Sequence, residues 1–371
     1  MQQNDYIVIV AEFPDKKNEK DGMIQRELAI DFVFSDIKRI YLDLRQSNYK
    51  FLKYPKKWIL NKIYKCFNKL DCFKNNKVKL FNFLSNKKLY KLFENARIIY
   101  FHSIYNLTLI PQELIEKFVD KIIIDIHGCV VEELIYYEQE KKIVDKFQKF
   151  ENEFFPKVKA LISVSNNMID FYKNKYPNIN TKFINLPIFN RFKINDNIIN
   201  SKKNINIIYS GGSQKWQNVD IMIDSISKIA NNYKVTLLTP DISVFSEKLK
   251  KYKNLLEKIE IKTVPSNLLY QEYEKADYGY ILRDDIIVNK VACPTKIIEY
   301  LNYGIIPIVL QPEIGDFNNL GYSYITNDNL ILGNIPNSDE LKKMRLKNMN
   351  IINTLSQIRE KGEQDLLNLY N

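Results

Sequence analysis

Three charged residues, Arg283, Lys296 and Glu299, have types and spacing that suit binding of a phosphorylated ligand. Arg283 ends a short apolar run, and Pro294-Thr295-Lys296 begins an amphipathic segment that contains Glu299. The pattern predicts strand, loop and helix, with Pro294 and Thr295 at the helix start. Arg283 would then lie at the carboxyl end of a strand, and Lys296 and Glu299 in the first turns of the next helix. Open α/β sheets bind ligands at this edge, and helix N-termini attract phosphate.

A second candidate phosphate site is the small-residue turn Ser210-Gly211-Gly212, which follows an apolar run and precedes a helical pattern. Such a turn lets backbone N–H groups approach a diphosphate. Lys215 lies close by in the sequence, so Gly211, Gly212 and Lys215 join the predicted ligand-binding residues.

The only two histidines, His102 and His127, each follow an apolar run that predicts a buried strand. A lone histidine is commonly structural, but ligand sites gather at the carboxyl ends of parallel strands. Asp125 is interpreted as orienting a turn beside His127. Glu132 and Glu133 are interpreted as a helix-start pair favoured by the macrodipole, with contact to a second substrate as the alternative.

Elements that position these residues alternate between strands and helices along the whole chain, which predicts an α/β fold with parallel sheets. The 371 residues exceed the usual size of a single core. We expect a domain over residues 1–195, a turn-rich linker over 195–204, a second domain over 204–337 and a helical segment over 338–371. One long helix is expected from about Val131 to Phe154, and Ser165 is expected to cap the helix that follows it.

The stretch "ILRDD…ACPTKIIEYLNYGIIPIV" resembles the C-terminal donor-binding motif of the GT-B glycosyltransferases of family 4, and "IIIDIHGCVVEE" resembles their strand-end Asp-x-His-Gly segment. The resemblance implies two Rossmann-like domains facing a cleft, with the last helix crossing back to the first domain. It implies that Glu299 holds the nucleotide ribose and that His127 contacts the donor sugar near the reacting centre. It also implies a retaining reaction without a bound metal or other cofactor.

The sequence departs from the family pattern at three positions. Where the family has an arginine after the first glycine and a lysine five residues later, this chain has Gly212 and Gln217, and Val291 replaces a glutamate eight residues before Glu299. We therefore expect Lys215, Arg283 and Lys296 to meet the phosphate charge. We expect Asp284, Asp285 and Asn289 to bind the sugar hydroxyls in place of the missing glutamate. Gly22, in the loop after the first strand, and His102 are weaker candidates for the acceptor or phosphate loop.

The formal net charge of +11 is concentrated in Lys50–Lys91, which holds thirteen lysines against the single acidic residue Asp71, with interleaved aromatics. This composition favours an anionic membrane surface as the partner; a solvated basic face over a core and nucleic acid are the alternatives. No nucleic-acid motif occurs, so we expect no nucleic-acid partner. No apolar run is long enough to span a bilayer, and the four cysteines lack metal-ligand spacing. We expect a cytoplasmic protein, peripheral at the inner face of the cell membrane, with reduced thiols.

These features predict a hexosyltransferase-type glycosyltransferase. It would move a sugar from a nucleotide diphosphate, with UDP favoured, to a hydroxyl of a lipid-linked or growing glycan of a capsule or lipopolysaccharide. Two alternatives remain. One is a catalytically inactive nucleotide-sugar-binding partner of another glycosyltransferase, and the other is a nucleotide-sugar epimerase.

Overall fold

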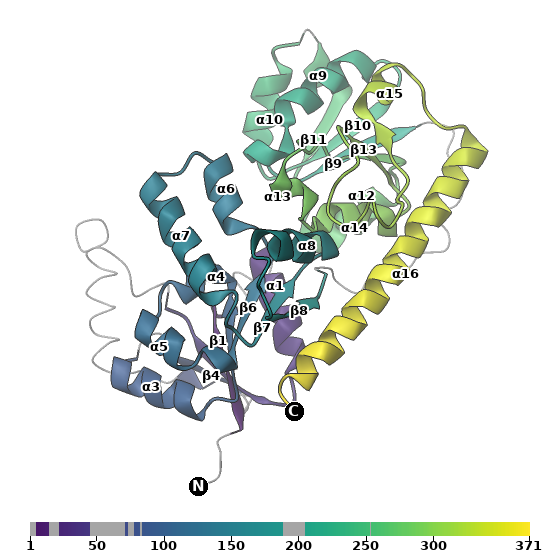
Figure 1. Ribbon diagram of the computed structural model, residues 1–371. Coiled ribbons are helices and arrows are strands. Elements are labelled where there is room, and N and C mark those ends of the chain that lie inside the picture. The colour runs from purple at the N-terminus through teal and green to yellow at the C-terminus, as the bar shows by residue number, and fades with distance from the viewer. Residues whose placement is uncertain are drawn as a thin grey trace. The chain divides into compact units, whose positions relative to one another are not determined.

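The structure, a computed structural model, describes residues 5–14, 22–44, 71–72, 78–81, 84–187, 205–252 and 254–371. The chain divides into two compact units (Figure 1). Unit 1 comprises Met1–Leu186 with Arg359–Asn371, and unit 2 comprises Pro187–Ile358. The predicted linker over 195–204 and most of the Lys50–Lys91 region lie outside the described residues. Within the described ranges, no helix is both long enough and apolar enough to cross a bilayer.

Unit 1 is built on an eight-stranded sheet whose strands pair in parallel except at one edge, where β3 and β4 are antiparallel. In sheet order the strands are β3 (Asp71–Cys72), β4 (Val78–Phe81), β2 (Lys38–Leu42), β1 (Tyr6–Val10), β5 (Ile98–His102), β6 (Ile122–Ile126), β7 (Ala160–Ser163) and β8 (Lys182–Asn185). Every residue of β1, β5 and β6 is buried, as expected for parallel strands covered by helices on both faces.

The helices of unit 1 connect these strands. They are α1 (Gly22–Val33), α3 (Asn86–Asn95), α4 (Ser103–Leu107), α5 (Gln112–Lys117), the 3-10 turn η2 (Val119–Lys121), α6 (Val130–Tyr136), α7 (Lys141–Phe154) and α8 (Asn166–Lys175). The expectation of one helix from Val131 to Phe154 is wrong. Glu138 adopts a left-handed φ of 53°, and the N–H of Gln139 donates to the carbonyl of Leu134 (3.0 Å), which closes α6 in a Schellman-type turn.

Unit 2 contains a six-stranded, fully parallel sheet. In sheet order its strands are β11 (Ile259–Lys262), β10 (Lys234–Leu238), β9 (Asn206–Ser210), β12 (Tyr278–Tyr280), β13 (Ile306–Val309) and β14 (Ile325–Thr326). The connecting elements are η4 (Lys215–Gln217), α9 (Val219–Ile229), α10 (Ile242–Leu249), α11 (Leu255–Lys258), η5 (Ser266–Leu268), α12 (Leu269–Tyr273), α13 (Ile287–Lys290), α14 (Thr295–Asn302) and α15 (Asn327–Ile331). The predicted α/β class with parallel sheets is confirmed.

The long C-terminal helix α16 (Ser338–Asn368), yellow in Figure 1, contributes residues to both units. In unit 2, Arg345 donates to Asp277 (2.5 Å), and both side chains are buried. In unit 1, Leu366 and Tyr370 belong to the core cluster beside β1, β5 and β8. Gly362 lies so close to β8 that an added Cβ would stand 2.3 Å from the carbonyl oxygen of Asn185.

Candidate functional site

The sheet order of unit 2 creates a topological switch point at the end of β9. This strand has β10 on one side and β12 on the other, so the chain crosses in opposite directions from it. Crevices at such switch points are where open α/β sheets bind ligands. Ser210 ends β9, and Arg283 follows β12 by three residues. Lys296 is the second residue of α14.

Lys296 is buried, with 9 % of its surface exposed, and its ammonium nitrogen lies against the Gly211 turn. Nζ donates to Oε1 of Gln217 (2.9 Å) and lies 4.1 Å from the centroid of the Tyr209 ring. A Cβ added to Gly211 would stand 2.8 Å from this nitrogen. Glycine at position 211 therefore leaves the space that the lysine head group occupies.

Arg283 approaches the same turn from the loop after β12. It is 8 % exposed, and its Nη1 donates to the carbonyl oxygen of Trp216 (2.9 Å). Burial lowers the pKa of Lys296 well below its usual range, and the Arg283 guanidinium lowers it further, while Glu299 acts in the opposite direction. The buried lysine and the Arg283 guanidinium thus converge on residues 211–217, an arrangement that an anionic ligand would stabilise.

Glu299 lies one helical turn beyond Lys296 on α14. Its Oε2 accepts a hydrogen bond from the hydroxyl of Tyr273 (2.8 Å), which also lies 2.9 Å from Oγ of Ser210. Burial raises the pKa of Glu299, and the Tyr273 hydrogen bond and Lys296 oppose this shift. A partly buried carboxylate held by one donor keeps acceptor capacity for the hydroxyls of a ligand.

The backbone of the glycine turn is less open to a phosphate than its composition suggests. The N–H of Gly211 donates to the carbonyl of Leu238 (2.9 Å), and the N–H and Oγ of Ser213 both donate to Asp241 (2.8 Å each). The N–H of Gly212 donates to no acceptor in the described part of the chain. A single free backbone donor leaves most of the charge compensation to side chains.

Some of the remaining predicted donor-site residues are exposed at the surface, and others form hydrogen bonds within the loop between β12 and α14. Lys215, on η4, and Thr295 are exposed, and Pro294 occupies the N-cap position of α14. Asn289 is buried, and its Nδ2 donates to the carbonyl of Asp284 (3.0 Å).

The carboxylates proposed for the sugar hydroxyls also have partners. Oδ1 of Asp284 accepts from Nδ2 of Asn218 (2.8 Å), and Asp285 pairs with Lys290 (2.7 Å). Val291, at the position of the missing glutamate, is 2 % exposed. In this structure Asn289 and Asp284 brace the loop between β12 and α14.

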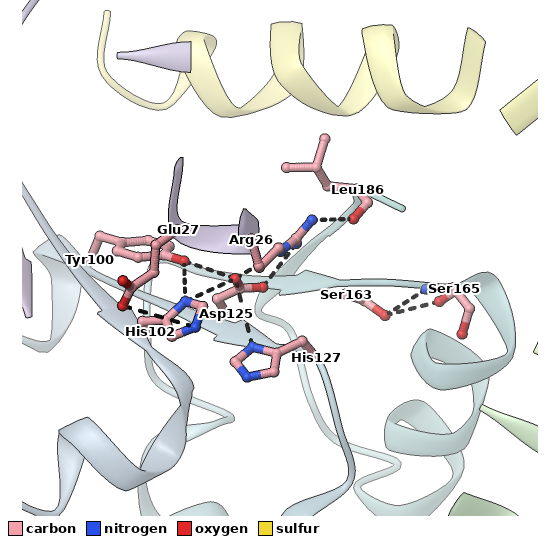
Figure 2. Close-up of polar contacts among 9 residues, drawn as sticks. All are labelled: Arg26, Glu27, Tyr100, His102, Asp125, His127, Ser163, Ser165 and Leu186. Atoms are coloured by element: carbon pink, nitrogen blue, oxygen red, sulfur yellow. Dashed lines mark hydrogen bonds and ion pairs between the residues drawn. The ribbon is translucent and has the colours of Figure 1, made fainter. Parts of the chain in front are cut away.

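In unit 1, the strand register gathers polar side chains at the carboxyl ends of neighbouring strands (Figure 2). His102 of β5 pairs with Asp125 of β6, and Ile126 pairs with Ser163 of β7. His127 follows β6 directly. Ser165 accepts from the N–H of Met168 (3.1 Å) at the start of α8, which confirms its predicted role as an N-cap.

Asp125 is the centre of this group and is completely buried. Nε and Nη2 of Arg26 donate to its two oxygens (2.9 Å each), and the hydroxyl of Tyr100 donates to Oδ2 (2.8 Å). Arg26 also donates to the carbonyl of Leu186 (2.6 Å). Burial alone would raise the pKa of Asp125, but the Arg26 guanidinium and the nearby histidine nitrogens hold it well below its usual range.

His102 is fully buried beneath His127, and Nδ1 lies 3.1 Å from the Tyr100 hydroxyl oxygen. With the Tyr100 proton donated to Asp125, a neutral His102 that carries its proton on Nδ1 donates to the Tyr100 oxygen; the roles in this contact depend on the tautomer. Burial, together with His127, lowers the pKa of His102 to about 4. His102 is therefore neutral at pH 7. It is not exposed itself and stacks against His127 from the buried side.

His127 stacks on His102 with ring centroids 4.5 Å apart and an interplanar angle of 26°. Its side chain is 10 % exposed, and Nδ1 lies 3.8 Å from Oδ2 of Asp125 (Figure 2). The carboxylate of Glu133 lies over Gly128, where an added Cβ would stand 2.3 Å from Oε1. Glu132 instead binds Nζ of Lys175 (2.7 Å), so the two neighbouring glutamates have different surroundings.

His102, Asp125 and His127 bring three possible metal ligands within 4.8 Å of one another. Both oxygens of Asp125, however, already accept hydrogen bonds from Arg26, and a metal cation would face that guanidinium. A fixed positive charge beside the ligands opposes a second one. The donor set fits a buried support on which the His127 ring stacks better than it fits a metal centre.

Sequence reasoning missed Arg26, Tyr100 and the tyrosines of unit 2. Arg26 and Glu27 are both buried, but in the sequence they follow Gln25 as one polar stretch of α1, so the pattern did not distinguish them from an exposed face. Gly22 is the first residue of α1, the helix that carries Arg26.

Comparisons with known proteins identify the fold. No protein-family model and no curated protein sequence matches the chain. Among solved structures, HepE of Anabaena in complex with UDP and glucose has a TM-score of 0.62 at 11% identity, covering 97% of this chain and 98% of its own. A glycosyltransferase from Rickettsia africae has a TM-score of 0.60 at 14% identity, covering 98% and 97% respectively.

An α,α-trehalose-phosphate synthase (UDP-forming) from Burkholderia vietnamiensis has a TM-score of 0.62 at 9% identity, covering 98% of this chain and 99% of its own. At these identities the likeness establishes the architecture, which is the GT-B fold over nearly the full chain.

Proposed function

We propose that this protein is a glycosyltransferase that moves a sugar from a nucleotide diphosphate donor to a hydroxyl acceptor. The GT-B fold is one support, and the donor-site residues of unit 2 are the other. UDP is the proposed nucleotide, because HepE is described in complex with UDP and UDP-glucose and the trehalose-phosphate synthase is described as UDP-forming.

The observation that carries the proposal is the pair of desolvated cations, Arg283 and Lys296, directed at the Gly211 turn. Burying two like charges side by side is unfavourable in the absence of an anion. A diphosphate supplies that anion, and the Arg283 fork suits its oxygens. As the sugar–phosphate bond breaks, negative charge grows on the diphosphate, and prearranged cations stabilise it.

Glu299 is proposed to accept hydrogen bonds from the ribose hydroxyls. Its distance along α14 from Lys296, one helical turn, fits the separation of a ribose from its diphosphate. Tyr273 fixes the carboxylate by donating to Oε2. In the absence of the glutamate replaced by Val291, we assign the sugar hydroxyls to the loop around Asp284, Asp285 and Asn289.

In unit 1, His127 is proposed to contact the donor sugar near the reacting centre. Asp125 and the neutral His102 hold its ring from behind. We propose retention of configuration, with a leaving phosphate oxygen accepting the proton of the acceptor hydroxyl. This route needs neither a strong side-chain base nor a metal, because Arg283 and Lys296 offset the charge of the leaving diphosphate.

The proposed acceptor is a lipid-linked or growing cell-surface glycan, such as a capsule or lipopolysaccharide, reached at the cytoplasmic face of the membrane. The basic Lys50–Lys91 region supports this location by its charge. Helix α3 covers the end of the Lys50–Lys91 region and continues to Asn95. It buries Leu89 and Phe93 and exposes Lys87, Lys88 and Lys91.

Binding to anionic vesicles tests this location. Changing Lys53, Lys56, Lys57 and Lys62 to Glu should release the protein, because each lysine near such a surface contributes about 1 kcal/mol. Equal cosedimentation with anionic and neutral vesicles would contradict the location.

Thermal stabilisation by a panel of UDP-, GDP-, TDP- and CMP-sugars, followed by product analysis with the stabilising donor, tests the function. A specific donor raises Tm by mass action. Transfer or slow donor hydrolysis supports the enzyme. Binding without turnover on any acceptor indicates a catalytically inactive partner, and a changed sugar on the released nucleotide indicates an epimerase. Stabilisation by none of the donors refutes the proposal.

A further inference from the structure

We propose that Glu133 and Tyr105 of unit 1 form a subsite for the acceptor, and that the part of the acceptor bound there is an uncharged sugar ring. The inference rests on the proposed function and deepens it, because it names side chains that select the second substrate. The Glu133 carboxylate would accept hydrogen bonds from sugar hydroxyls beside His127. The Tyr105 ring would lie against the C–H face of the sugar.

Two neighbouring strands place these side chains at one edge of the sheet. β5 leads directly into α4, which carries Tyr105, and β6 leads through residues 127–129 into α6, which carries Glu133. Because β5 and β6 pair in parallel, both turns leave the sheet at its carboxyl edge, where α/β sheets bind ligands. Helix α4 also contacts β6 and α7, and α6 contacts α7 (Figure 1).

Glu133 has a carboxylate that is available to a ligand. In the described part of the chain, no hydrogen bond or ion pair reaches it, whereas the neighbouring Glu132 binds Nζ of Lys175 (2.7 Å). Glu133 is partly exposed, and its Oε1 lies over Gly128, the residue that follows His127. Burial raises the pKa of Glu133, and the charge of His127 opposes this shift, as expected for side chains that lie close together. An acceptor hydroxyl beside His127 would therefore meet carboxylate oxygens with unused acceptor capacity.

Tyr105 presents an aromatic ring at the same edge. Its side chain is 44% exposed, and the ring makes a T-shaped contact with Phe147 of α7, with centroids 4.8 Å apart. The turn that carries it is fixed, because the buried Ser103 adopts a left-handed φ of 73° and Nδ2 of Asn106 donates to the carbonyl of His102. Backbone strain of this kind gathers at functional sites. The turn thus holds an exposed ring in a defined position.

The two side chains together define the chemistry of the ligand. Burial raises the pKa of Tyr105, and the Glu133 charge raises it further, so the phenol and the carboxylate face a common region. An ionised carboxylate only accepts hydrogen bonds, which sugar hydroxyls donate, and the negative face of an aromatic ring attracts polarised C–H groups. A phosphate or carboxylate group at this position would be repelled by Glu133. The subsite therefore fits a neutral sugar.

Binding of simple glycosides to the full chain tests the subsite. Methyl β-glucoside, methyl β-galactoside and methyl β-N-acetylglucosaminide are titrated at saturating UDP, and saturation-transfer NMR reports their binding. At least one should bind the wild type. Glu133→Gln and Tyr105→Ala should each weaken this binding about tenfold or more, while UDP affinity measured by calorimetry changes little. Tyr105→Phe keeps the ring and should retain the binding.

Glu132→Gln and Tyr270→Ala are the matched controls, because Tyr270 in unit 2 has a similar exposure of 42%. Neither should change glycoside binding. The two glutamates should also differ in their effect on stability. Glu132→Gln should lower Tm, because it removes a charged partner of Lys175, whereas Glu133→Gln should not, because it breaks no ion pair of the described chain.

The outcomes separate this inference from the proposed function. UDP binding without binding of any of the three glycosides overturns the inference and leaves the proposed function intact. Wild-type glycoside affinity in Glu133→Gln or in Tyr105→Ala also overturns it, and so does an equal loss of glycoside binding in Glu132→Gln. Failure of UDP, GDP, TDP and CDP alike to bind the wild type overturns the proposed function and this inference with it.

Discussion

Individual residues in both units combine burial with charge in ways that folding alone does not favour. Lys296 and Arg283 are desolvated beside each other, and Asp125 is buried beneath two histidines. Asp125 is fully compensated by Arg26 and Tyr100, whereas Lys296 has one hydrogen bond to a neutral amide. This contrast predicts opposite effects on stability when each charge is removed.

Lys296→Met should raise the stability of the protein in the absence of nucleotide, by about 1 kcal/mol or more, while abolishing diphosphate binding. The folded-state pKa lies below the unfolded value of 10.5, so between these values the unfolded chain holds a proton that the folded chain lacks. Wild-type stability therefore rises with pH across this window, and the advantage of the variant shrinks. Urea unfolding at several pH values checks this, and a gap that widens toward pH 10.5 contradicts it.

Asp125→Asn should destabilise the protein by about 3–5 kcal/mol, because it leaves the Arg26 guanidinium buried without its counter-ion. Folding holds the pKa of Asp125 below its ordinary value of 3.8. The stability contributed by the Arg26–Asp125 ion pair is therefore complete above pH 3.8 and is lost as the pH falls toward the folded-state pKa. Asp5→Asn removes an exposed carboxylate paired with Arg97 (3.3 Å) and is the matched control, expected to leave Tm nearly unchanged. Equal losses in the two variants would argue against the buried pair.

Sequence periodicity identified most elements because buried parallel strands read as continuous apolar runs. The predicted places of Arg283, after a strand, and of Lys296 and Glu299, early in the next helix, agree with the structure, since all three lie within one local strand–loop–helix unit. The contact between Lys296 and Gln217 was not predictable, because it joins residues 79 positions apart. The bond from Arg26 to Asp125 spans 99 positions and depends on the packing of α1 against β6.

At the scale of elements, the turn after β9 and the start of α14 pack together, because Lys296 of α14 contacts Gly211 and Gln217. The turn lacks free backbone donors except at Gly212, and α14 brings the cation that the turn lacks. If the proposed diphosphate binds at this edge of the sheet, side chains of α14 and of the loop after β12, rather than the turn itself, would meet its charge.

Gly211→Ala should weaken binding of a nucleoside diphosphate by tenfold or more, because the new Cβ would stand 2.8 Å from Nζ of Lys296 at an unfavourable φ of 150°. Gly333→Ala is the control, because it also places alanine at a positive φ (75°) but nothing lies within 4 Å of the added Cβ and the position lies outside the candidate site, so affinity should change little. Calorimetry with UDP compares the two, and an equal loss would show that the effect does not come from crowding of Lys296.

At the scale of the whole molecule, α16 links the two compact units through one continuous helix. Its earlier part packs in unit 2 through Arg345 and the cluster that contains Ile351, Ile352 and Leu355. Its end completes the core of unit 1 through Leu366 and Tyr370. Unit 1 therefore depends on residues 359–371, which follow the whole of unit 2 in the sequence, to complete its core.

Leu366→Ala should destabilise unit 1 by about 3 kcal/mol, because Leu366 is fully buried and its truncation leaves a cavity against β1, β5 and β8. Leu346→Ala, on the same helix at 41% exposure, is the control and should change stability little.

The chain has two tryptophans, Trp58 in unit 1 and Trp216 in unit 2, so Trp58→Phe leaves fluorescence that reports on unit 2 alone. In that background, Leu366→Ala should lower the urea midpoint measured by circular dichroism and leave the Trp216 transition close to its original position. If both transitions shift together, α16 couples the two units into one cooperative structure, and the effect of Leu366 is not confined to unit 1.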